Sequence, residues 1–410
     1  MRKDQQRGLL SSKPTLVVVS NGITPYGAHF LRRVANEFSD FTLRTIYSYE
    51  FGMGHWQISP HPSINAVILG KGEEATGQRG IAAIRNGWTR YGQLVREIRA
   101  SSPAAVIILG YYPVAHFLTI EWCHRSGIPC LMLADSNILG DKNGRIKAWI
   151  KKWVVSRAVS RCRAILPCGT LGARYFQKYG ARPEQIFFAP PEPDYSLIED
   201  AVPIVVASLA AECRLDPGRR RLIYSGRLVA IKRVDLLIDA FARVAEQRPG
   251  WDLLIAGGGP LEAELKARVP NRLQPRVLWT GFVGSPQRMS ALYRLADVLV
   301  LPSDYEPWAL VVNEAACAGL ALICSDVVGA AAELLRDREN GCSFRADNAA
   351  SLVAALVDVT DEDNLRRYKA ASPGILKNWR KSADPVEGRR RALEFSFQPA
   401  TTSGTDQQRR

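Results

Sequence analysis

The strongest constraint on the fold of this chain is a repeated alternation of strand patterns and amphipathic helical patterns between residues 221 and 325. Runs such as 222–224, 251–256 and 298–301 are rich in apolar residues, and each is followed by glycine or proline at the strand end. Strands that alternate with helices form parallel sheets that are covered on both faces. We therefore predict an α/β fold.

Two glutamates near the end of this stretch, Glu306 and Glu314, lie eight positions apart around an expected helix start. Pro307 favours the first helical turn, which leaves backbone N–H groups free for an anion such as a diphosphate. Those groups belong to Trp308, Ala309 and Leu310. At a rise of about 1.5 Å per residue the carboxylates are roughly 10 to 12 Å apart, which suits the ribose and the hexose of a nucleotide sugar. The alternative is that Glu306 caps the helix and Glu314 is a solvated surface residue.

Two cations stand where the strand at 222–224 passes into the next helix. Arg227 and Lys232 follow a turn at Gly226, and the helix is expected from about Val234. A guanidinium contacts two phosphate oxygens at once and an ammonium supplies a mobile charge, so this pair suits a leaving diphosphate. Exposed basic residues beside a helix are also common without such a role.

A glycine triplet at 257–259 follows the next strand. Its missing side chains let the backbone approach a ligand closely, and we count Gly258 among the donor-binding residues. The triplet lacks the spacing of a dinucleotide site, and it is equally consistent with a simple turn. A further short strand ends at Gly281 and Phe282.

The order of these pieces resembles the C-terminal half of the retaining glycosyltransferases of family 4, which have the GT-B fold: two Rossmann-like domains facing a cleft. The resemblance covers about residues 221–344, through G-R…K, G-G-G-P-L, G-F-V, L-Y-R-x-A-D, L-P-S and E-P-W-A-L-V-V-N-E-A-A-x-A-G-L. It implies that Glu314 binds the ribose and that Glu306 contacts the donor sugar. Arg227 and Lys232 would hold the diphosphate.

The same resemblance places the backbone around Phe282 and Val283 against the base, with Gly226 and Gly258 near the donor. In that family the leaving phosphate oxygen takes the proton of the acceptor hydroxyl. Catalysis then consists of positioning and electrostatic support of the leaving diphosphate. No protein nucleophile, metal or cofactor is expected.

The chain departs from the family pattern at two places. Many relatives have Phe-Gly after the first glutamate where this chain has Pro307-Trp308, and a Gly-Gly pair where this chain has Gly329-Ala330. The first departure affects the shape of the donor-sugar pocket, and the second affects the turn near the phosphates. Neither removes a charged group.

The N-terminal half is expected to bind the acceptor. A first buried strand leads into a loop from Gly22 to Gly27 that would line the cleft. Asp135 and Ser136 follow another strand, at the position where open α/β sheets bind ligands, so Asp135 is our candidate near the anomeric centre. Its alternative role is a helix cap. His116, on the helix after Gly110, is a second candidate, although a helical histidine is more often packed than catalytic.

Metal binding is not predicted. The string 361–363 is D-E-D, which resembles a metal motif of a different glycosyltransferase fold, but it opens a late helix, where acidic residues favour the helix dipole. The eight cysteines are scattered without C-x-x-C spacing, so we interpret them as reduced core residues.

The net charge of +14 is densest between residues 141 and 163. In the helix expected there, basic and aromatic residues are interleaved, which suits contact with an anionic membrane. These residues are Lys147, Trp149, Lys151, Lys152 and Trp153. The alternative is that the tryptophans pack on the core and the lysines face water. Nucleic acid is not an expected partner, because no recognised binding module is present.

We therefore predict four segments: an acceptor domain at 1–195, a donor domain at 196–378, a last helix at 379–396 that returns to the first domain, and a disordered tail at 397–410. The N-terminus has no signal-peptide pattern and no apolar run is long enough to span a membrane, so we expect a cytoplasmic enzyme, alternatively peripheral on the inner face of the membrane.

The predicted function is a retaining glycosyltransferase that moves a sugar from a nucleoside-diphosphate sugar to a glycan or lipid-linked acceptor in surface polysaccharide or glycolipid synthesis. Two alternatives stay open: a sugar-nucleotide epimerase of similar architecture, and a non-catalytic partner subunit. The sequence leaves the donor base, the donor sugar and the acceptor undetermined.

Overall fold

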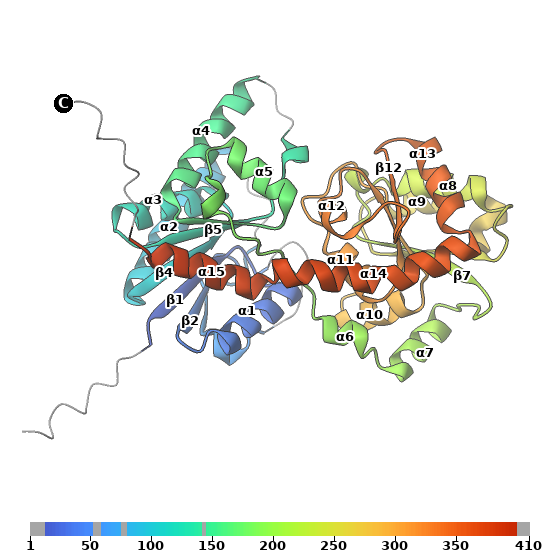
Figure 1. Ribbon diagram of the computed structural model, residues 1–410, viewed down its shortest axis with the longest axis horizontal. Helices are drawn as coiled ribbons and strands as arrows, with labels where there is room; N and C mark the ends of the chain where they lie inside the picture. The colour runs from blue at the N-terminus through green and yellow to red at the C-terminus, as the bar shows by residue number, and fades with distance from the viewer. Residues whose placement is uncertain (1–12, 52–58, 75–79, 142–144, 400–410) are drawn as a thin grey trace, which may run out of the picture.

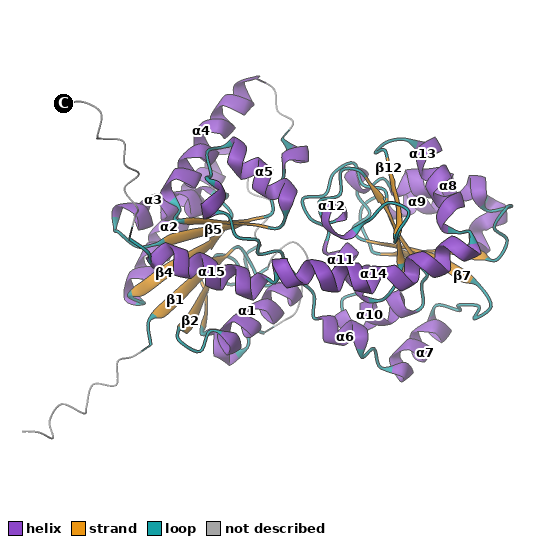
Figure 2. Ribbon diagram, in the orientation of Figure 1, coloured by secondary structure: helices purple, strands orange, loops and turns teal. Residues whose placement is uncertain are grey.

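The structure is a computed structural model that describes residues 13–51, 59–74, 80–141 and 145–399. It contains two parallel six-stranded sheets, each flanked by helices, in two bodies along the long axis of the molecule (Figures 1 and 2). The predicted α/β fold of two Rossmann-like domains is confirmed.

The first sheet has the strand order β3-β2-β1-β4-β5-β6. Its strands are β1 (Thr15–Ser20), β2 (Thr42–Tyr47), β3 (Ala66–Ile68), β4 (Pro103–Leu109), β5 (Cys130–Ala134) and β6 (Ala164–Pro167). The helices of this domain are α1 (Pro25–Glu37), α2 (Gly80–Ala100), α3 (Val114–Arg125), α4 (Arg145–Arg161) and α5 (Thr170–Lys178).

The second sheet has the order β12-β11-β10-β7-β8-β9. Its strands are β7 (Arg220–Ser225), β8 (Trp251–Ala256), β9 (Val277–Gly281), β10 (Val298–Leu301), β11 (Ala321–Ser325) and β12 (Gly341–Phe344). Its helices are α6 (Tyr195–Glu199), α7 (Pro203–Glu212), α8 (Val234–Val244), α9 (Glu262–Arg268), α10 (Pro286–Arg294), α11 (Leu310–Cys317), α12 (Ala331–Leu334), α13 (Ala349–Val359) and α14 (Glu362–Ala383). Short 3-10 helices lie at Pro62–Ile64, Ile138–Gly140, Pro183–Gln185, Ala230–Lys232 and Asn271–Arg276.

The apolar strand runs are explained by burial on both sheet faces. In β1, Val17 and Val19 enter one hydrophobic cluster while Leu16 and Val18 enter another on the opposite face. Alternate residues of a strand point to opposite faces, so a strand covered on both sides needs apolar residues at every position. Register is therefore set by two cores at once.

The chain crosses between the domains through the segment 188–194 and again at Asp384. After the first crossing, α6 packs against α10 and α11 of the second domain. Helix α14 runs on to Ala383, so the second break lies beyond the predicted boundary at 378, because Asp384 precedes a proline and takes an extended conformation. The last helix, α15 (Pro385–Phe397), packs against β6 and α1 of the first domain.

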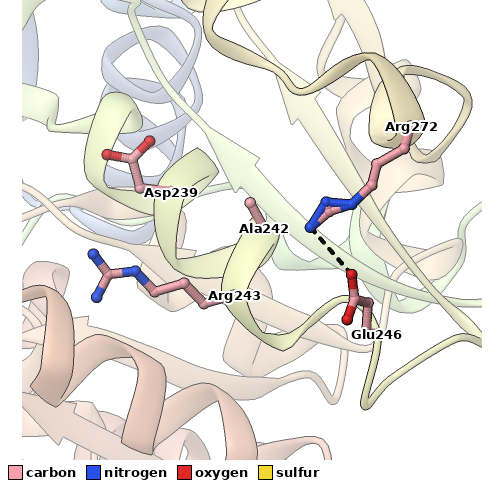
Figure 3. A pocket seen from close by; sticks show the side chains of 5 residues that line it. All are labelled: Asp239, Ala242, Arg243, Glu246 and Arg272. Carbon is pink, nitrogen blue, oxygen red and sulfur yellow. Dashed lines mark ion pairs between the residues drawn. The ribbon is translucent and has the colours of Figure 1, made fainter.

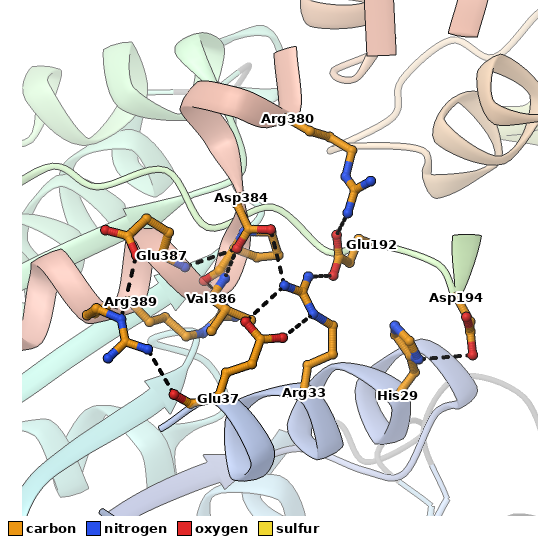
Figure 4. A network of polar contacts seen from close by, with 12 residues as sticks. His29, Arg33, Glu37, Glu192, Asp194, Arg380, Asp384, Val386, Glu387 and Arg389 are labelled. Atoms are coloured by element: carbon orange, nitrogen blue, oxygen red, sulfur yellow. Dashed lines mark hydrogen bonds and ion pairs between the residues drawn. The ribbon is translucent and has the colours of Figure 1, made fainter. Parts of the chain in front are cut away.

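A polar network joins both crossings to α1 (Figure 4). Arg33 of α1 forms ion pairs with Glu192 of the linker, with Asp384 at 3.2 Å and with Glu37 at 2.7 Å. Glu192 is 2% exposed, and Arg380 of α14 approaches it at 3.5 Å. A buried carboxylate requires such cations, so the network holds the linker and the C-terminal helices against the first domain.

Some expectations concern residues outside the described ranges. They concern the N-terminal residues 1–12, where no signal peptide is expected, and most of the tail predicted to be disordered, at 400–410.

Candidate active site

Each sheet has a switch point where neighbouring strands send their following helices in opposite directions: between β1 and β4, and between β7 and β10. Ligands of open α/β sheets bind beyond the carboxyl ends of strands at such points. Arg227 and Lys232 follow β7, and Glu306 follows β10. Three of the predicted residues therefore come from the two strands that define the switch point of the second domain.

Lys232 and Glu306 are directly paired. The Nζ atom of Lys232 forms a short ion pair with Oε1 of Glu306, and the hydroxyl of Ser303 donates a hydrogen bond of 2.7 Å to the same oxygen. Glu306 is 5% exposed. A carboxylate so buried needs a cation and hydrogen bonds to offset its lost hydration. Ser303 is a partner that sequence reasoning missed, although it lies only three positions upstream.

Arg227 is exposed, in contrast to Lys232. Its loop is held by Tyr224, whose hydroxyl donates to the carbonyl oxygen of Arg227 at 2.8 Å. A Cβ atom on Gly257 would lie 1.8 Å from the carbonyl oxygen of Gly226, so the loops after β7 and β8 touch through their backbones. Both glycines have positive φ, 158° and 151°. The first glycine of the triplet is therefore required by this close approach.

The loop after β9 lies next to the same triplet. A Cβ atom on Gly258 would lie 3.6 Å from both the Cβ and the backbone nitrogen of Phe282. Phe282 is 62% exposed, whereas Val283 packs against the core of the domain. The predicted base-contacting segment is thus adjacent to the predicted phosphate-side loops.

Glu314 is not a solvated surface residue. It lies on α11, where the hydroxyl of Tyr293 on α10 donates a hydrogen bond of 2.7 Å to its Oε2 atom. Burial raises the pKa of Glu314 to about 7, against the smaller opposing effect of that hydrogen bond. Tyr293 is a second partner that the sequence reasoning did not single out.

Helix α11 begins at Leu310, three residues later than predicted from Pro307. The reason is that the preceding loop pairs with 328–330 instead: Gly329 donates to the carbonyl oxygen of Glu306 at 3.1 Å, and Ala330 donates to that of Trp308 at 2.7 Å. Glu306 therefore does not cap the helix. The residue at the cap is Ala309, with a φ of 81°.

The Trp308 side chain faces the core of the second domain. It is 5% exposed, stacks on Trp379 of α14 with 5.5 Å between ring centroids, and donates from Nε1 to Asn313 at 3.1 Å. Only its backbone is left for the predicted role with the donor.

At the second departure from the family pattern, a Cβ atom on Gly329 would lie 2.1 Å from the carbonyl oxygen of Pro307, so the first glycine of that pair is the one the turn requires.

In the first domain, Asp135 follows β5 and lines a narrow cavity between the domains together with Pro307 and Gly329 of the second domain. Asp135 is exposed at the surface, but neighbouring protein atoms displace part of the water around its carboxyl group. This partial desolvation raises the pKa of Asp135. Ser136 lies beside it, with its hydroxyl 3.3 Å from that of Tyr111. The structure therefore brings Asp135 to the loop that carries Glu306.

Two predictions for the first domain need correction. Gly27 is part of α1 and not of the preceding loop, because Pro25 starts the helix and Thr24 caps it by accepting from the Gly27 amide at 3.2 Å. Gly22 does lie in the loop after β1.

His116 does not line the domain interface. It is fully buried, with its ring nitrogens 3.1 Å from the Ser48 hydroxyl and 2.8 Å from the Leu109 carbonyl oxygen, and burial lowers its pKa to about 4. The packed alternative is therefore correct.

Two contacts across the domain interface were not predicted. The side-chain amide of Asn137, after β5, donates to the carbonyl oxygens of Glu306 and Pro307. Glu333 of α12 accepts from the backbone amide and the hydroxyl of Thr170 on α5, both at 2.6 Å. An asparagine directly after Asp-Ser at a strand end is a signal for a side chain that bonds nearby backbone, but the sequence does not identify a partner in another domain.

A larger hollow, of about 510 Å³, lies on the outer side of the second domain (Figure 3). It is lined by Asp239, Ala242, Arg243 and Glu246, with Arg272 paired to Glu246 at 3.3 Å. None of the predicted site residues line it. The candidate site is therefore the interdomain region and not this hollow.

The basic and aromatic helix, α4, stands at the outer edge of the first domain (Figure 1). Trp149 is 71% exposed and Trp153 54% exposed, and Lys152 is exposed as well. Lys151 is instead paired with Asp141 at 2.8 Å. The alternative in which the tryptophans pack on the core is therefore wrong. Lys147 belongs to this helix, but its side chain lies outside the described part of the structure.

Metal binding and membrane spans can be addressed for the described residues. Within them, no group of three or more histidine, cysteine, aspartate or glutamate side chains is arranged to hold a metal ion. The acidic string at 361–363 caps and opens α14. No helix in these residues is both long and apolar enough to cross a bilayer.

Comparison with solved structures concerns the fold. The structure of HepE from Anabaena, solved in complex with UDP-glucose, is similar over 93% of this chain and 98% of its own, with a TM-score of 0.68 and 14% sequence identity. At that identity the likeness concerns the fold alone, which is the GT-B arrangement of two Rossmann-like domains.

Sequence comparison finds similarity over part of the chain. Residues 209–371 match the family model for glycosyl transferases group 1. Glycogen synthase from Mycobacterium tuberculosis is 36% identical over 167 residues, which are 40% of this chain and 39% of that protein. The lipopolysaccharide core biosynthesis mannosyltransferase LpsB of Rhizobium meliloti is 32% identical over 183 residues, 43% of this chain and 51% of its own. The chain thus spans about half or less of the length of these curated relatives.

Proposed function

We propose that this protein is a retaining glycosyltransferase that uses a nucleoside-diphosphate sugar. The observation that carries the proposal is the ion pair of Lys232 with the buried Glu306, placed at the switch point beside the exposed Arg227. Two cations and a carboxylate at the carboxyl ends of neighbouring strands suit a sugar diphosphate. The match of residues 209–371 to the family model for glycosyl transferases group 1 supports the same interpretation.

The cations would bind the diphosphate and stabilise it as it leaves. Lys232 is already held near the site by Glu306, and Arg227 is free to turn toward a ligand. When the diphosphate binds, it competes with Glu306 for Lys232. Glu306 then becomes available to accept a hydrogen bond from a hydroxyl of the donor sugar. The Glu306 carboxylate would then be held by hydrogen bonds, from Ser303 and from the sugar hydroxyl, in place of its cation. We propose that no metal is required, because these two cations supply the positive charge.

In the proposed reaction, the bond between the sugar C1 and the leaving phosphate oxygen breaks, and a bond from C1 to the acceptor oxygen forms on the same face. The proton of the acceptor hydroxyl passes to the departing phosphate oxygen. Asp135 lies across the narrow cavity and would orient the acceptor. Glu314 would bind the ribose, with the backbone at 282–283 against the base.

We further propose that the acceptor is lipid-linked and that the enzyme works at the inner face of the cytoplasmic membrane. Trp149, Ile150 and Trp153 form an exposed apolar surface on α4, and the exposed Lys152 lies among them. Large aromatic side chains with lysines between them suit the interface of an anionic bilayer. A contiguous exposed apolar surface of this kind is typical of a site that contacts a membrane or another macromolecule.

The test is calorimetric titration of UDP, GDP and ADP into the wild type and into Lys232→Ala, followed by incubation with matching sugar donors. One diphosphate should bind the wild type at micromolar strength and bind the variant far more weakly. Released diphosphate and a new glycoside with the donor's anomeric configuration would then show transfer with retention. An isomerised free sugar nucleotide would instead show an epimerase. Binding without any turnover would point to a partner subunit.

A further inference from the structure

We infer that Asn137 is a positioning residue that couples the arrangement of the two domains to the loop carrying Glu306. The inference rests on the proposed function, since it gives Asn137 a role in the same transfer reaction. Asn137 lies directly after β5 in the first domain and is 2% exposed. Its side-chain amide forms four hydrogen bonds, and these divide between the two domains.

Its side-chain oxygen belongs to the first domain. It accepts from the backbone amides of Leu139 at 3.0 Å and Gly140 at 3.2 Å, which caps the short 3-10 helix Ile138–Gly140. These two bonds fix the orientation of the amide group. They also settle which end of the amide faces the second domain, because only the oxygen can accept from the two N–H groups.

Its side-chain nitrogen reaches the second domain. It donates to the carbonyl oxygens of Glu306 at 3.1 Å and Pro307 at 2.8 Å. The Glu306 carbonyl oxygen also accepts from the amide of Gly329, so one side chain from the first domain holds the loop at the point where it pairs with 328–330. Buried bonds of this kind are lost together if the domain faces separate.

Other contacts between the two domains lie close to Asn137. A Cβ atom on Gly140 would lie 2.3 Å from both Cζ and the hydroxyl oxygen of Tyr305, so the capped turn and the loop before Glu306 are in close contact. On the far side, Thr170 donates to Glu333. The loop that bears Glu306 is therefore shaped by the first domain as well as by its own sheet. When the domains move apart, the carbonyl oxygens of Glu306 and Pro307 each lose the Asn137 amide, while the Lys232 pair within the second domain persists.

The sharpest test is Asn137→Asp. This change keeps an oxygen to accept from Leu139 and Gly140, but it turns a second, negatively charged oxygen toward two carbonyl oxygens. Because the diphosphate contacts lie within the second domain, we expect the Kd for the cognate nucleoside diphosphate to change by less than about threefold while kcat falls by about tenfold or more. Asn271→Asp, at an exposed position of the second domain, is the matched control and should leave both values unchanged.

A pH series separates this role from a general loss of structure. A protonated aspartate at 137 regains one O–H donor for a carbonyl oxygen, so the ratio of variant kcat to wild-type kcat should rise between pH 8 and pH 5.5. Small-angle scattering supplies a readout without turnover: Asn137→Asp should have a larger radius of gyration than the wild type at pH 8. If Asn137→Asp does not fold, Gly140→Ala, which pushes on Tyr305, should give the same split between Kd and kcat.

Wild-type kcat together with a wild-type radius of gyration in Asn137→Asp would overturn the inference. The inference would also be overturned if Asn137→Asp lost diphosphate binding and turnover together and the ratio of variant kcat to wild-type kcat did not change with pH. A wild type that binds no nucleoside diphosphate and transfers no sugar would instead count against the proposed function, and the scattering comparison would still decide whether Asn137 holds the domains together.

Discussion

Tyr293 of α10 donates a hydrogen bond of 2.7 Å from its hydroxyl to the Oε2 atom of Glu314 on α11. Burial of the carboxylate favours its protonated form, and the hydrogen bond favours its ionised form. Burial is the stronger effect, since the pKa of Glu314 is raised to about 7. In the unliganded protein this carboxylate is therefore only partly ionised near neutral pH.

The first prediction concerns the pH dependence of nucleotide binding. A ribose hydroxyl donates best to an ionised carboxylate, and Glu314 loses its charge as the pH falls through about 7. We expect the Kd for the cognate nucleoside diphosphate to be about tenfold larger at pH 6 than at pH 8. Calorimetry across this range provides the measurement. Glu314→Gln should bind weakly at both pH values, and a wild-type pH profile in that variant would exclude Glu314 as the cause.

The same pKa shift predicts an effect on stability. The folded-state pKa lies above the ordinary value of 4.5, so the folded protein holds this proton more tightly than the unfolded chain does. Its stabilising contribution is complete below pH 4.5 and is lost as the pH rises through about 7. The Tm of Glu314→Gln minus the Tm of the wild type should therefore be more positive at pH 8 than at pH 5. The same Tm difference at both pH values would contradict the raised pKa of Glu314.

The Lys232–Glu306 pair should show strong coupling in a double-mutant cycle. Lys232→Ala leaves the carboxylate of Glu306 buried beside Ser303 without its cation, and we expect a loss of about 3 kcal/mol in the free energy of unfolding. Adding Glu306→Gln should recover a large part of that loss, because no buried charge remains. Denaturant unfolding of the four proteins gives the coupling energy. Simple additivity of the two substitutions would mean that the pair does not exist in solution.

Ala309 should gain stability on replacement by glycine. Its φ of 81° lies in the left-handed region, which costs a side chain about 1 kcal/mol that glycine avoids. We therefore expect Ala309→Gly to raise the free energy of unfolding by about 1 kcal/mol. The matched control is Ala207→Gly, at an exposed position within α7, which should lower it by about 1 kcal/mol. The same sign for both variants would argue against the backbone conformation at 309.

Membrane contact through α4 is testable with vesicles that contain an anionic lipid. The double variant Trp149→Ala/Ile150→Ala removes two large exposed apolar groups, so it should bind such vesicles about tenfold more weakly. Its diphosphate binding should stay at the wild-type value, because the proposed donor site lies in the other domain. Ile204→Ala, at a 75% exposed position on α7, should bind vesicles like the wild type. Equal binding by all three proteins would remove α4 from the proposed membrane surface.

Much of the second domain could be predicted from local patterns. The strand predicted at 222–224 occurs within β7 (Arg220–Ser225), and the strand at 251–256 and the helix from Val234 occur as predicted, because apolar runs and glycine turns leave few conformations open. The start of α11 could not be predicted in this way. Pro307 favours a helical turn locally, but hydrogen bonds from 329 and 330 draw the loop into pairing with a distant segment. A local preference is weaker than two tertiary hydrogen bonds.

The residue types of the candidate site, their order along the chain and the α/β fold were determined by the sequence itself, since strand burial, glycine turns and charged loop residues are local properties. The tertiary structure alone decided which of these residues meet. It paired Lys232 with Glu306 and buried His116. It also turned Trp308 into the core and left Trp149 exposed. Asn137 acquired its partners in the other domain in the same way. Burial and pairing depend on segments far apart in the chain, and no local pattern encodes how two domains face each other.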